Sequence, residues 1–359
     1  MKVGVIGGGP SGLTIARMLS DKGYEVYVYE AHRSFAVKPC GWGYPTPDSD
    51  EKKYGVFSEA VKASLWVFKG YDVYLNDDLL FHSDKQILGY IIDKKQFLEN
   101  LSQGIEVERG SPARYLGGGL IRGRSGVKRF DIVIIAGGFP AQPRRLDRIL
   151  AVQAIIKSPR IEDAEIPELR FYSDLVGYAW VFPEGEKTAR VGVGGYADRE
   201  TLEKILSMVI KKRQDLAKGE VIKKEGAEVT VSGVDWDLAR SRDPFYVGEA
   251  LGYTMPVTGE GIRPAIWSSI ALFNAIENGN SYEEELRKLK LTRFIGIQRK
   301  ILDIMLKMKP SERDLFIKNV PEDLMLDLSL GRAGTFDLLR LAKIPELAMI
   351  LAKYAIKII

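Results

Sequence analysis

Three glycines near the N-terminus have the spacing of a phosphate-binding turn. Gly7, Gly9 and Gly12 follow the apolar run Val3–Ile6, and a helical pattern begins directly after them. The first glycine permits a tight turn, the second lets the backbone approach a pyrophosphate, and the third lets the helix lie close to the strand. The next apolar run ends in Glu30, whose carboxylate can accept hydrogen bonds from an adenosine ribose. The pattern predicts a dinucleotide site at a helix N-terminus.

A long segment after the second apolar run gathers reactive and aromatic side chains. It extends from Ala31 to Asp50 and holds Cys40, Trp42 and Tyr44. A connection of this length in a compact domain is commonly either disordered or functional, and disordered segments are poor in aromatic residues. We therefore predict a functional loop. A free cysteine more often ends as a buried neutral thiol, so residue type alone leaves both roles open for Cys40.

Three aromatic residues alternate along one predicted strand. Because Tyr178, Trp180 and Phe182 are two positions apart, their side chains project to one face. An aromatic face most often belongs to a protein core, and the alternative is the wall of an apolar ligand cavity. Gly192 and Gly194 would keep the following strand free of bulky side chains and leave space for a ligand. The residues themselves leave both interpretations open.

A second glycine turn opens a helix in the last third of the chain. The turn Gly259-Glu260-Gly261-Ile262 lies shortly after Pro256 and before a helical pattern that begins at Ala265. Backbone N–H groups at such a helix start can stabilise negative charge on a bound group. The alternatives are an ordinary glycine turn and a helix that Glu260 caps by itself.

The elements that must position these residues follow two patterns. The strand–helix–strand unit at the N-terminus and the continuous apolar run Asp131–Gly138 predict a parallel sheet that is buried on both faces. From about Ala151 the apolar residues alternate, which predicts a separate antiparallel sheet with strands at 169–172, 177–183 and 189–194. Further strands are expected at 71–75, 89–92, 105–108, 120–124, 128–130 and 245–252, and helices at 93–101, 200–216, 265–277 and from 282 onward.

We therefore expect an α/β fold, α+β overall. It combines a Rossmann-type nucleotide-binding domain, an interleaved antiparallel-sheet domain for the substrate and a C-terminal helical region. The predicted boundaries are residues 1–50, 90–150 and 242–281 for the first, 51–89 and 151–241 for the second, and 282–359 for the third.

The composition excludes several classes of partner. Basic and acidic residues number 52 and 48, and no basic run is interleaved with aromatic residues, so we expect no nucleic acid. The two histidines, His32 and His82, have no spacing typical of a metal site, so we expect no metal. A single cysteine allows no intramolecular disulfide, and a strand that begins at residue 3 leaves no room for a signal peptide. Both observations predict a cytoplasmic protein.

The C-terminal segment Ile344–Ile359 is apolar with interspersed lysines, and these lysines interrupt it too often for a bilayer span. Three interpretations remain open. The first is a helix that covers the substrate domain, and the second is a dimer face. The third is a helix that lies on a membrane surface and collects a lipid substrate.

Three regions far apart in the chain resemble the FAD contact regions of the flavoprotein family that includes the aromatic hydroxylases. They are the Gly7–Gly12 turn with Glu30, the run Asp131–Gly138, and Gly248-Glu249 followed by the turn at 259–262. Within that family, the segment 38–43 looks like the proline-cysteine-glycine loop of the geranylgeranyl reductases. The run 178–183, with GxG at 192–194, is similar to the second signature of that group, YxWxFP followed by GxG.

This resemblance implies FAD in the first domain and an isoprenoid chain in a tunnel between the two sheets. The implied reaction saturates carbon–carbon double bonds of geranylgeranyl or other prenyl chains in archaeal-type lipids or related isoprenoids. Cys40 and Tyr44 are then the candidate proton donors opposite the flavin. The implied substrate-binding residues are Trp42, Tyr178, Trp180, Phe182, Gly192 and Gly194. The implied FAD-binding residues are Gly7, Gly9, Pro10, Ser11, Gly12, Glu30, Ala31, Cys40, Gly41, Ala136, Gly137, Gly248, Glu249, Gly259, Gly261 and Ile262.

Three positions depart from the family pattern. Trp42 stands where the group usually has glycine, Glu249 stands where an aspartate meets the flavin ribityl chain, and Lys94 stands where arginine is usual. Glu249 can still reach a ribityl hydroxyl if the backbone withdraws by about one methylene. An indole at position 42 would narrow the tunnel or close it.

No second complete dinucleotide fingerprint occurs, so the electrons are expected from an external donor, either a reduced carrier protein or a soluble coenzyme. Two other functions remain open on the same scaffold. One is a flavin monooxygenase or other FAD oxidoreductase that acts on an aromatic or hydrophobic small molecule. The other is a non-catalytic flavin protein that only relays electrons.

Overall fold

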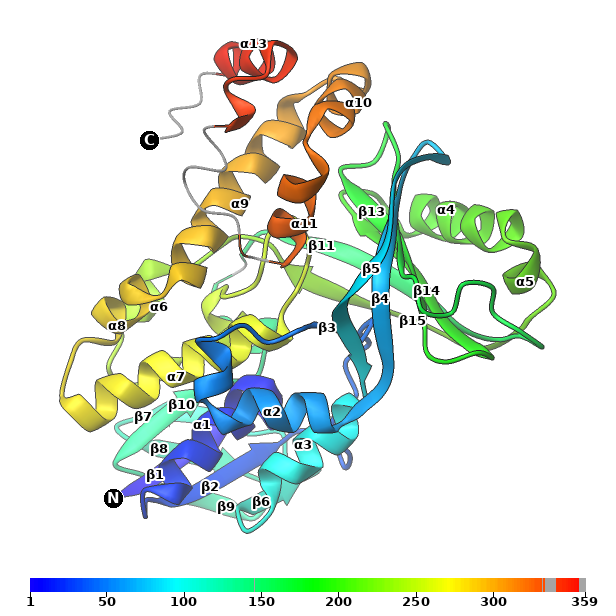
Figure 1. The fold of residues 1–359 in the computed structure, drawn as a ribbon. Coiled ribbons are helices and arrows are strands. Elements are labelled where there is room, and N and C mark those ends of the chain that lie inside the picture. The colour runs from blue at the N-terminus through cyan, green and yellow to red at the C-terminus, as the bar shows by residue number, and fades with distance from the viewer. Residues whose placement is uncertain (145, 331, 333–339, 355–359) are drawn as a thin grey trace.

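The computed structural model describes residues 1–144, 146–330, 332 and 340–354 of the chain. A five-stranded sheet lies at the lower left of Figure 1, an eight-stranded sheet at the right, and the C-terminal helices at the top. The predicted combination of a Rossmann-type sheet, a second sheet and C-terminal helices is confirmed.

The five-stranded sheet is parallel throughout, with the strand order β16-β10-β1-β2-β6. Its strands are β1 (Lys2–Ile6), β2 (Glu25–Glu30), β6 (Glu106–Arg109), β10 (Ile132–Ile135) and β16 (Phe245–Tyr246). From β1 the chain passes to β2 on one side, while β10 lies on the other side. The carboxyl ends of β1 and β10 therefore form the topological switch point at which such sheets bind ligands.

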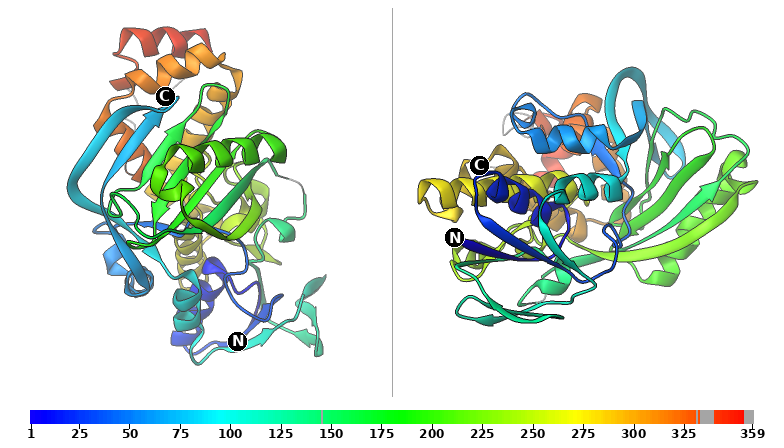
Figure 2. Two further views of the ribbon diagram at one scale, coloured as in Figure 1. Left: turned by 90° about the vertical axis from the view of Figure 1, so that its right-hand side faces the viewer. Right: turned by 90° about the horizontal axis from the view of Figure 1, so that it is seen from below.

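Both faces of this sheet are covered. One face packs against α1 (Pro10–Asp21), α3 (Lys94–Ser102) and α7 (Ile262–Asn278), with α2 (Gly55–Lys62) against α3. The other face meets a three-stranded sheet of β7 (Arg114–Gly117), β8 (Leu120–Gly123) and β9 (Gly126–Arg129). Gly4 permits this close approach, because a β-carbon there would lie 2.6 Å from Ile121 and Phe130. The right-hand view of Figure 2 shows these layers from below.

The eight-stranded sheet has the order β15-β11-β14-β13-β12-β4-β5-β3. Its strands are β3 (Gly43–Pro45), β4 (Ser64–Leu75), β5 (Asp78–Ile92), β11 (Arg148–Lys157), β12 (Glu168–Phe171), β13 (Gly177–Pro183), β14 (Thr188–Gly195) and β15 (Glu220–Thr230). All neighbouring strands are antiparallel except β4 and β12. The expected antiparallel sheet is thus a mixed one, because the hairpin β4–β5 joins it from an earlier part of the chain.

Helix α4 (Arg199–Lys212) and the short α5 (Gln214–Ala217) cover one face of this sheet. Leu202, Leu206 and Val209 of α4 pack against Val191 and Val193 of β14, and all five are buried. Because side chains alternate along a strand, Arg190, Gly192 and Gly194 face the opposite side. That opposite face carries the candidate site.

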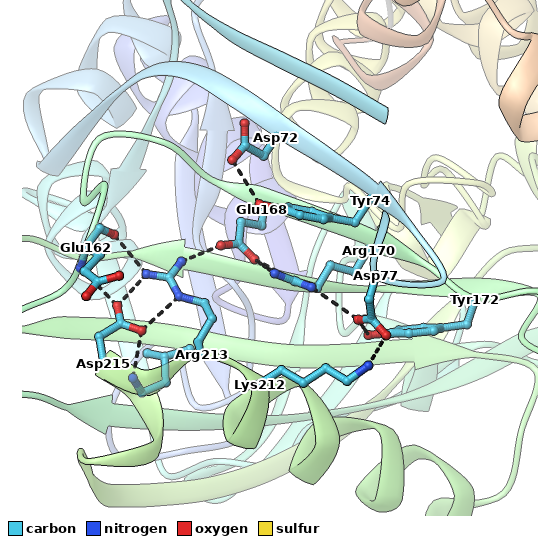
Figure 3. A network of polar contacts seen from close by, with 11 residues as sticks. Asp72, Tyr74, Asp77, Glu162, Glu168, Arg170, Tyr172, Lys212, Arg213 and Asp215 are labelled. Atoms are coloured by element: carbon cyan, nitrogen blue, oxygen red, sulfur yellow. Dashed lines mark hydrogen bonds and ion pairs between the residues drawn. The ribbon is translucent and has the colours of Figure 1, made fainter. Parts of the chain in front are cut away.

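Ion pairs tie α5 to the strands beneath it (Figure 3). The Arg213 guanidinium lies 2.5 Å from carboxylate oxygens of both Glu168 and Asp215. Arg170 contacts Glu168 at 2.6 Å and Asp77, in the β4–β5 turn, at 3.3 Å. Glu168, Arg170 and Asp215 are buried, so water does not solvate their charges. The ion pairs within this network must neutralise them instead.

The C-terminal region is helical as predicted, with α8 (Tyr282–Lys288), α9 (Lys290–Lys307), α10 (Pro310–Asn319), α11 (Glu322–Leu330) and α13 (Pro345–Lys353). Helix α13 packs on α10 through the buried Leu347 and Ile350, whereas Met349 is two-thirds exposed. Residues 355–359 of the segment interpreted above lie outside the described residues. Within the described part of the chain, no helix combines the length and apolar character needed to cross a bilayer.

Several local predictions were wrong. The segment 31–50 includes strand β3, which pairs with β5, so it is not a loop throughout. The hairpin β4–β5 is far longer than the predicted strands 71–75 and 89–92. The predicted strand 245–252 is the two-residue β16 followed by the 3₁₀ turn η3 (Gly248–Leu251). The other short helices are α6 (Trp236–Arg240), η1 (Glu51–Lys53) and η2 (Phe139–Ala141). The domain boundaries stay a prediction.

Candidate cofactor and substrate site

The N-terminal glycine turn has the geometry that a phosphate cradle requires. Gly7 has a φ of +113°, and a β-carbon there would lie 2.4 Å from the Ala136 carbonyl oxygen. A β-carbon on Gly12 would lie 1.9 Å from the Gly7 carbonyl oxygen, so only glycine lets α1 approach the turn. Gly9 has no neighbour within 4 Å of a β-carbon position, and α1 begins at Pro10 without a side-chain cap. The first amides of α1 are therefore free to bind an anion.

Glu30 is held beside this turn at the end of β2. Its carboxylate accepts hydrogen bonds from the backbone N–H groups of Gly8 and His32, each at 2.8 Å. The side chain is buried, so these two bonds fix the positions of its oxygens. A carboxylate has about four acceptor sites. Glu30 therefore retains capacity for ribose hydroxyls, and Ala31 directly follows it.

The opposite wall of the cradle is formed by other small residues. Gly248 begins η3 with a φ of +61°, and a β-carbon there would lie 2.6 Å from the Ser11 hydroxyl oxygen. The Gly248 N–H donates to the Ser268 hydroxyl at 2.9 Å, which fixes η3 to α7. Ala136 and Gly137 follow the end of β10 at the same switch point. The structure brings together the predicted FAD-binding residues that follow β1 and β10 and those that begin α1 and η3.

Glu249 connects this cradle to the segment Ala31–Asp50, which contains Cys40 and is called the cysteine-bearing segment below. Its carboxylate lies 2.6 Å from the Lys38 ammonium and also accepts the Thr230 N–H at 3.1 Å. The Lys94 ammonium donates to the Lys38 carbonyl oxygen at 2.7 Å, and Lys94 is buried. Burial lowers the pKa of Lys94 below its usual value. A contact of Glu249 with a ribityl chain stays a prediction.

The cysteine-bearing segment lies on the aromatic strand β13. A β-carbon on Gly41 would lie 3.2 Å from Phe182 and 3.3 Å from the Trp180 indole nitrogen. The carbonyl oxygen of Cys40 accepts a hydrogen bond from the Gln153 side chain at 3.2 Å. The segments that resemble the two signatures are therefore in direct contact.

The aromatic face predicted on β13 is confirmed. Ring centroids are 6.1 Å apart between Tyr178 and Trp180 and 6.3 Å apart between Trp180 and Phe182. The expectation that Gly192 leaves space for a ligand is wrong, because a β-carbon there would lie 2.1 Å from the Trp180 ring. That glycine makes room for the indole. Gly194 is less crowded, with its nearest neighbour, Ala151, at 3.2 Å.

Trp42 is held in an unusual backbone conformation. Its φ is +63°, in the left-handed region that favours glycine. The guanidinium of Arg190 lies 3.5 Å from the centre of its ring, and Arg190 is paired with Glu184 at 3.1 Å. The indole is thus stacked on a buried cation from β14.

Tyr44 is the most isolated polar group of the segment. It is only 2% exposed, and its hydroxyl has no hydrogen-bond partner among the described residues. Burial raises the pKa of Tyr44 well above its ordinary value, and the nearby carboxylate of Glu51 raises it further. Tyr178 is partly buried, and its hydroxyl donates to the Thr258 carbonyl oxygen at 2.5 Å, beside the second glycine turn.

Sequence reasoning missed a buried ion cluster next to Tyr44. Arg263, at the start of α7, lies 2.8 Å from the Glu260 carboxylate and 3.6 Å from Glu51. The Glu51 carboxylate also accepts the Trp267 indole N–H at 3.2 Å. Glu51 and Arg263 are each about 2% exposed. Their separation in the sequence hides the pair, although the spacing of Glu260 and Arg263 is that of neighbours on one helix face.

A pocket of about 450 Å³ opens beside this cluster. Glu51, Arg263 and Trp267 line it together with Tyr54 and Phe294, and charged side chains such as Lys290 line it as well. It lies between η1, α7 and the start of α9. Glu51 therefore lines this pocket although it is almost fully buried.

The sheet face under the cysteine-bearing segment carries further unpaired polar atoms. The carbonyl oxygen of Gln153, the indole nitrogen of Trp180 and Nε of Arg190 are buried and have no hydrogen-bond partner among the described residues. Such atoms mark places where a water or a bound group completes the hydrogen bonding. In the described ranges, no group of histidine, cysteine or acidic side chains is arranged to hold a metal ion.

Comparison with known proteins finds relatives that match most of the chain. Residues 5–46 match a family described as the NAD(P)-binding Rossmann-like domain. The chain is 28% identical to the digeranylgeranylglycerophospholipid reductase of Thermoplasma acidophilum, over 74% of this chain and 75% of that protein. The enzymes of the same name from Methanospirillum hungatei and Methanosarcina acetivorans are 22% and 26% identical, and the matches cover 98% and 89% of this chain and 96% and 86% of those proteins.

Solved structures share the fold. A geranylgeranyl bacteriochlorophyll reductase-like protein from Thermoplasma acidophilum superposes with a TM-score of 0.78 at 24% identity, covering 98% of both chains. The 2-methyl-3-hydroxypyridine-5-carboxylic acid oxygenase superposes with a TM-score of 0.62 at 17% identity, covering 94% of this chain and 98% of that chain. At these identities the likeness establishes the fold, which reductases and oxygenases share.

Proposed function

The chain belongs to the geranylgeranyl reductase family of flavoprotein oxidoreductases, and from this premise we propose that it binds FAD and saturates carbon–carbon double bonds of prenyl chains. The substrate class is the geranylgeranyl chains of archaeal-type lipids or related isoprenoids. The observation that carries the proposal is the contact of the cysteine-bearing segment with the aromatic strand β13, beside the cradle built by the first glycine turn.

The residues of the cradle fit FAD. The open space at Gly9 and the uncapped amides of α1 suit a pyrophosphate, and the Glu30 carboxylate suits a ribose. The start of α7 at Ile262 directs backbone amides toward the second glycine turn, where negative charge on a reduced isoalloxazine would be stabilised. When bound and reduced, FAD supplies the hydride for one carbon of the double bond.

The remaining groups position the substrate and supply the proton. Tyr178, Trp180 and Phe182 would form an apolar wall along the prenyl chain. Trp42, which stacks on Arg190 opposite Phe182 in the pairing of β13 with β14, would lie at its edge. A proton donor must stay protonated until the reaction, and the buried hydroxyl of Tyr44 meets this condition because its pKa is raised. Cys40 is the second candidate donor. Burial of the site would exclude water from it.

We propose that electrons arrive from an external donor, either a reduced carrier protein or a soluble coenzyme. The described residues hold no cluster suited to a metal centre. The proposed compartment is the cytoplasm. Peripheral contact with a membrane would bring the lipid substrate to the enzyme, and the exposed Met349 on α13 is a candidate contact. Flotation with liposomes tests this contact, and protein that stays unbound would exclude it.

The test uses the purified full chain. An absorption spectrum reports bound flavin, and the protein is then reduced without oxygen and mixed with a geranylgeranyl glycerophospholipid. The expected product gains two hydrogens for each saturated bond, as read by mass spectrometry. The Gly9→Ala variant, whose added methyl group meets no protein atom within 4 Å but would occupy the space proposed for the pyrophosphate, is the control and should form no product. Flavin-loaded protein that leaves the lipid unchanged would contradict the proposal.

A second candidate function has one observation in its favour. The unpaired polar atoms of Gln153, Trp180 and Arg190 would suit a polar or aromatic substrate better than a hydrocarbon chain. A flavin monooxygenase of this kind would consume oxygen in the presence of NAD(P)H and substrate. A reductase would not, so an oxygen electrode separates the two.

A further inference from the structure

The three-stranded sheet β7-β8-β9 concentrates positive charge. Its segment 111–129 has no acidic residue, although the chain as a whole has a net charge of only +4. The basic residues of this segment are Arg114, Arg122, Arg124, Lys128 and Arg129. These five cations exceed the net charge of the whole protein, so the rest of the chain is slightly acidic in sum.

The two faces of this sheet differ. Ile121 of β8 is buried against β1, and Lys128, opposite it on β9, has its ammonium 3.5 Å from the centre of a tyrosine ring on β2. Because side chains alternate along a strand, Arg122 and Arg129 project from the other face. Both are exposed, and so is Arg114, which lies opposite Arg122 on β7. The lysine therefore packs on the five-stranded sheet, while the three arginines point into solvent.

Arg114 and Arg122 form a like-charge pair. They are directly opposite in the antiparallel register of β7 and β8, where the β-carbons of facing residues are about 4.5–5.5 Å apart. Like charges in this position destabilise a sheet. Among the described residues, no carboxylate pairs with Arg114, Arg122 or Arg129, and Arg129 donates only to the Gly118 carbonyl oxygen at 3.1 Å. The protein therefore retains a repulsion that an anionic partner would relieve.

Exposed aliphatic side chains accompany the arginines. Val127, which is opposite Arg122 on β9, is 49% exposed, and Leu116, near the end of β7, is 42% exposed. The strand positions of this face hold no aromatic residue on which nucleotide bases could stack. Arginines interleaved with aliphatic side chains suit a layer of anionic lipid headgroups above hydrocarbon.

We propose that this face binds the surface of a membrane that contains anionic phospholipids. The arginines would contact phosphate groups, while Leu116 and Val127 would enter the boundary between headgroups and hydrocarbon chains. The inference rests on the proposed function for its purpose, because an enzyme that saturates prenyl lipids must obtain its substrate from a bilayer. The face lies at the opposite end of the molecule from α13 (Figure 1), so a flat bilayer that binds here does not contact Met349.

The test measures sedimentation of the full chain with lipid vesicles and needs no turnover. Wild-type protein should bind vesicles of phosphatidylglycerol mixed with phosphatidylcholine, should bind them less as salt is added, and should not bind pure phosphatidylcholine. The variant that combines Arg114→Gln, Arg122→Gln and Arg129→Gln should bind about a hundredfold more weakly, since each arginine near an anionic surface contributes about a fivefold factor. Equal binding by this variant and the wild type would overturn the proposal. Wild-type protein that ignores the anionic vesicles would also overturn it and would leave an acidic protein as the partner of this face.

Two controls locate the contact. Arg199→Gln, Arg240→Gln and Arg287→Gln together remove the same net charge from exposed ion pairs elsewhere, so this combined variant should bind vesicles as the wild type does. Met349→Ser, on α13, should also leave binding unchanged. Loss of binding in the first control would assign the effect to overall charge, and loss in the second would assign the contact to α13. Either result contradicts the proposal.

A second measurement does not involve membranes. Arg122→Gln should raise the midpoint of thermal unfolding at low salt, because it removes the repulsion from Arg114, and the gain should shrink as salt is added. Arg199→Gln, which breaks an exposed pair with Glu203, should bring no such gain. A lower midpoint in Arg122→Gln would show that the protein itself satisfies the arginine pair, and the argument for an anionic partner would fail.

Activity on lipid dispersed in detergent separates this inference from the proposed function. Wild-type protein that reduces dispersed geranylgeranyl lipid but does not bind anionic vesicles would refute the membrane contact and leave the function standing. Wild-type protein that binds the vesicles through the arginines but reduces no prenyl lipid would refute the function and leave the membrane contact standing.

Discussion

The ammonium of Lys38 lies 2.6 Å from the carboxylate of Glu249 and joins the cysteine-bearing segment to the 3₁₀ turn η3. The two residues are 211 positions apart, and each belongs to a region that resembles a different family signature. An aspartate, which is usual at position 249, is one methylene shorter and would not reach Lys38 as closely. The glutamate thus replaces a family feature with a link that holds the segment over the cradle.

The first prediction concerns this link. Glu249→Asp should free Lys38 and loosen residues 36–44, while the unfolding free energy changes by less than about 1 kcal/mol, because the Lys38 side chain is partly exposed. Faster amide hydrogen exchange in residues 36–44 is the expected readout. The control is Glu165→Asp, which shortens the partner of Lys69 on the surface. Equal exchange in both variants would mean that the ion pair does not hold the segment.

The second prediction separates the ring of Trp42 from its backbone. Trp42→Gly and Trp42→Ala both remove the stack on Arg190, but only glycine adopts the φ of +63° without strain. Trp42→Gly should therefore be more stable than Trp42→Ala by about 1 kcal/mol in chemical denaturation. Both should accept bulkier prenyl substrates than the wild type. An alanine variant as stable as the glycine variant would show that the backbone relaxes at no cost.

Local patterns predicted the elements around the cradle because their signals are contiguous. Pro10 at the start of α1 and the carboxylate of Asp93, which accepts the N–H groups of Lys95 and Gln96 at the start of α3, mark helix ends that the sequence states directly. The Tyr44–Glu51–Arg263 cluster has no such signal, because Arg263 comes from a helix more than two hundred residues away. The edge strand β3 was not predicted for the same reason. It is a strand only because it pairs with β5, which lies more than thirty residues later in the chain.

The third prediction tests the two glycines of β14. A β-carbon at position 192 would lie 2.1 Å from the Trp180 ring, whereas one at position 194 would make a tight contact of 3.2 Å with the Ala151 β-carbon but would not overlap it. Gly192→Ala should displace the indole and destabilise the protein by about 1–3 kcal/mol. Gly194→Ala should have a smaller effect. Tryptophan fluorescence and thermal unfolding report both changes, and equal effects at the two positions would contradict the packing described.

The fourth prediction concerns the network of Figure 3. Arg213→Met would leave Glu168 and Asp215 buried without their shared cation, at a cost of about 3–5 kcal/mol. In the wild type, burial tends to raise the pKa of Asp215, but the hydrogen bond from Arg213 and the other contacts outweigh it and lower the pKa below 3.8. The stability that Asp215 contributes is therefore present above the unfolded-state pKa and lost as the pH falls through the lowered value.

Without Arg213, burial should raise the pKa of Asp215 above 3.8, so the contribution of Asp215 to the pH dependence of stability should change sign. The variant should then gain stability relative to the wild type as the pH falls through the raised pKa. Denaturant unfolding between pH 3 and 7 measures both curves. Parallel curves would show that Arg213 does not set the ionisation of Asp215. Arg199→Met, which removes an exposed pair with Glu203, is the control and should leave the curve unchanged.

The last prediction separates cofactor binding from folding at the first glycine turn. A β-carbon at Gly9 meets nothing within 4 Å in the protein, so Gly9→Ala should fold with wild-type stability. The same methyl group would project into the space proposed for the FAD pyrophosphate, so the flavin content should fall at least tenfold. Gly12→Ala should instead lose both stability and flavin, because its β-carbon would lie 1.9 Å from the Gly7 carbonyl oxygen. Gly55→Ala, at an equally open position on α2, is the control for a harmless methyl group. If Gly9→Ala keeps its flavin, the pyrophosphate does not bind at this turn.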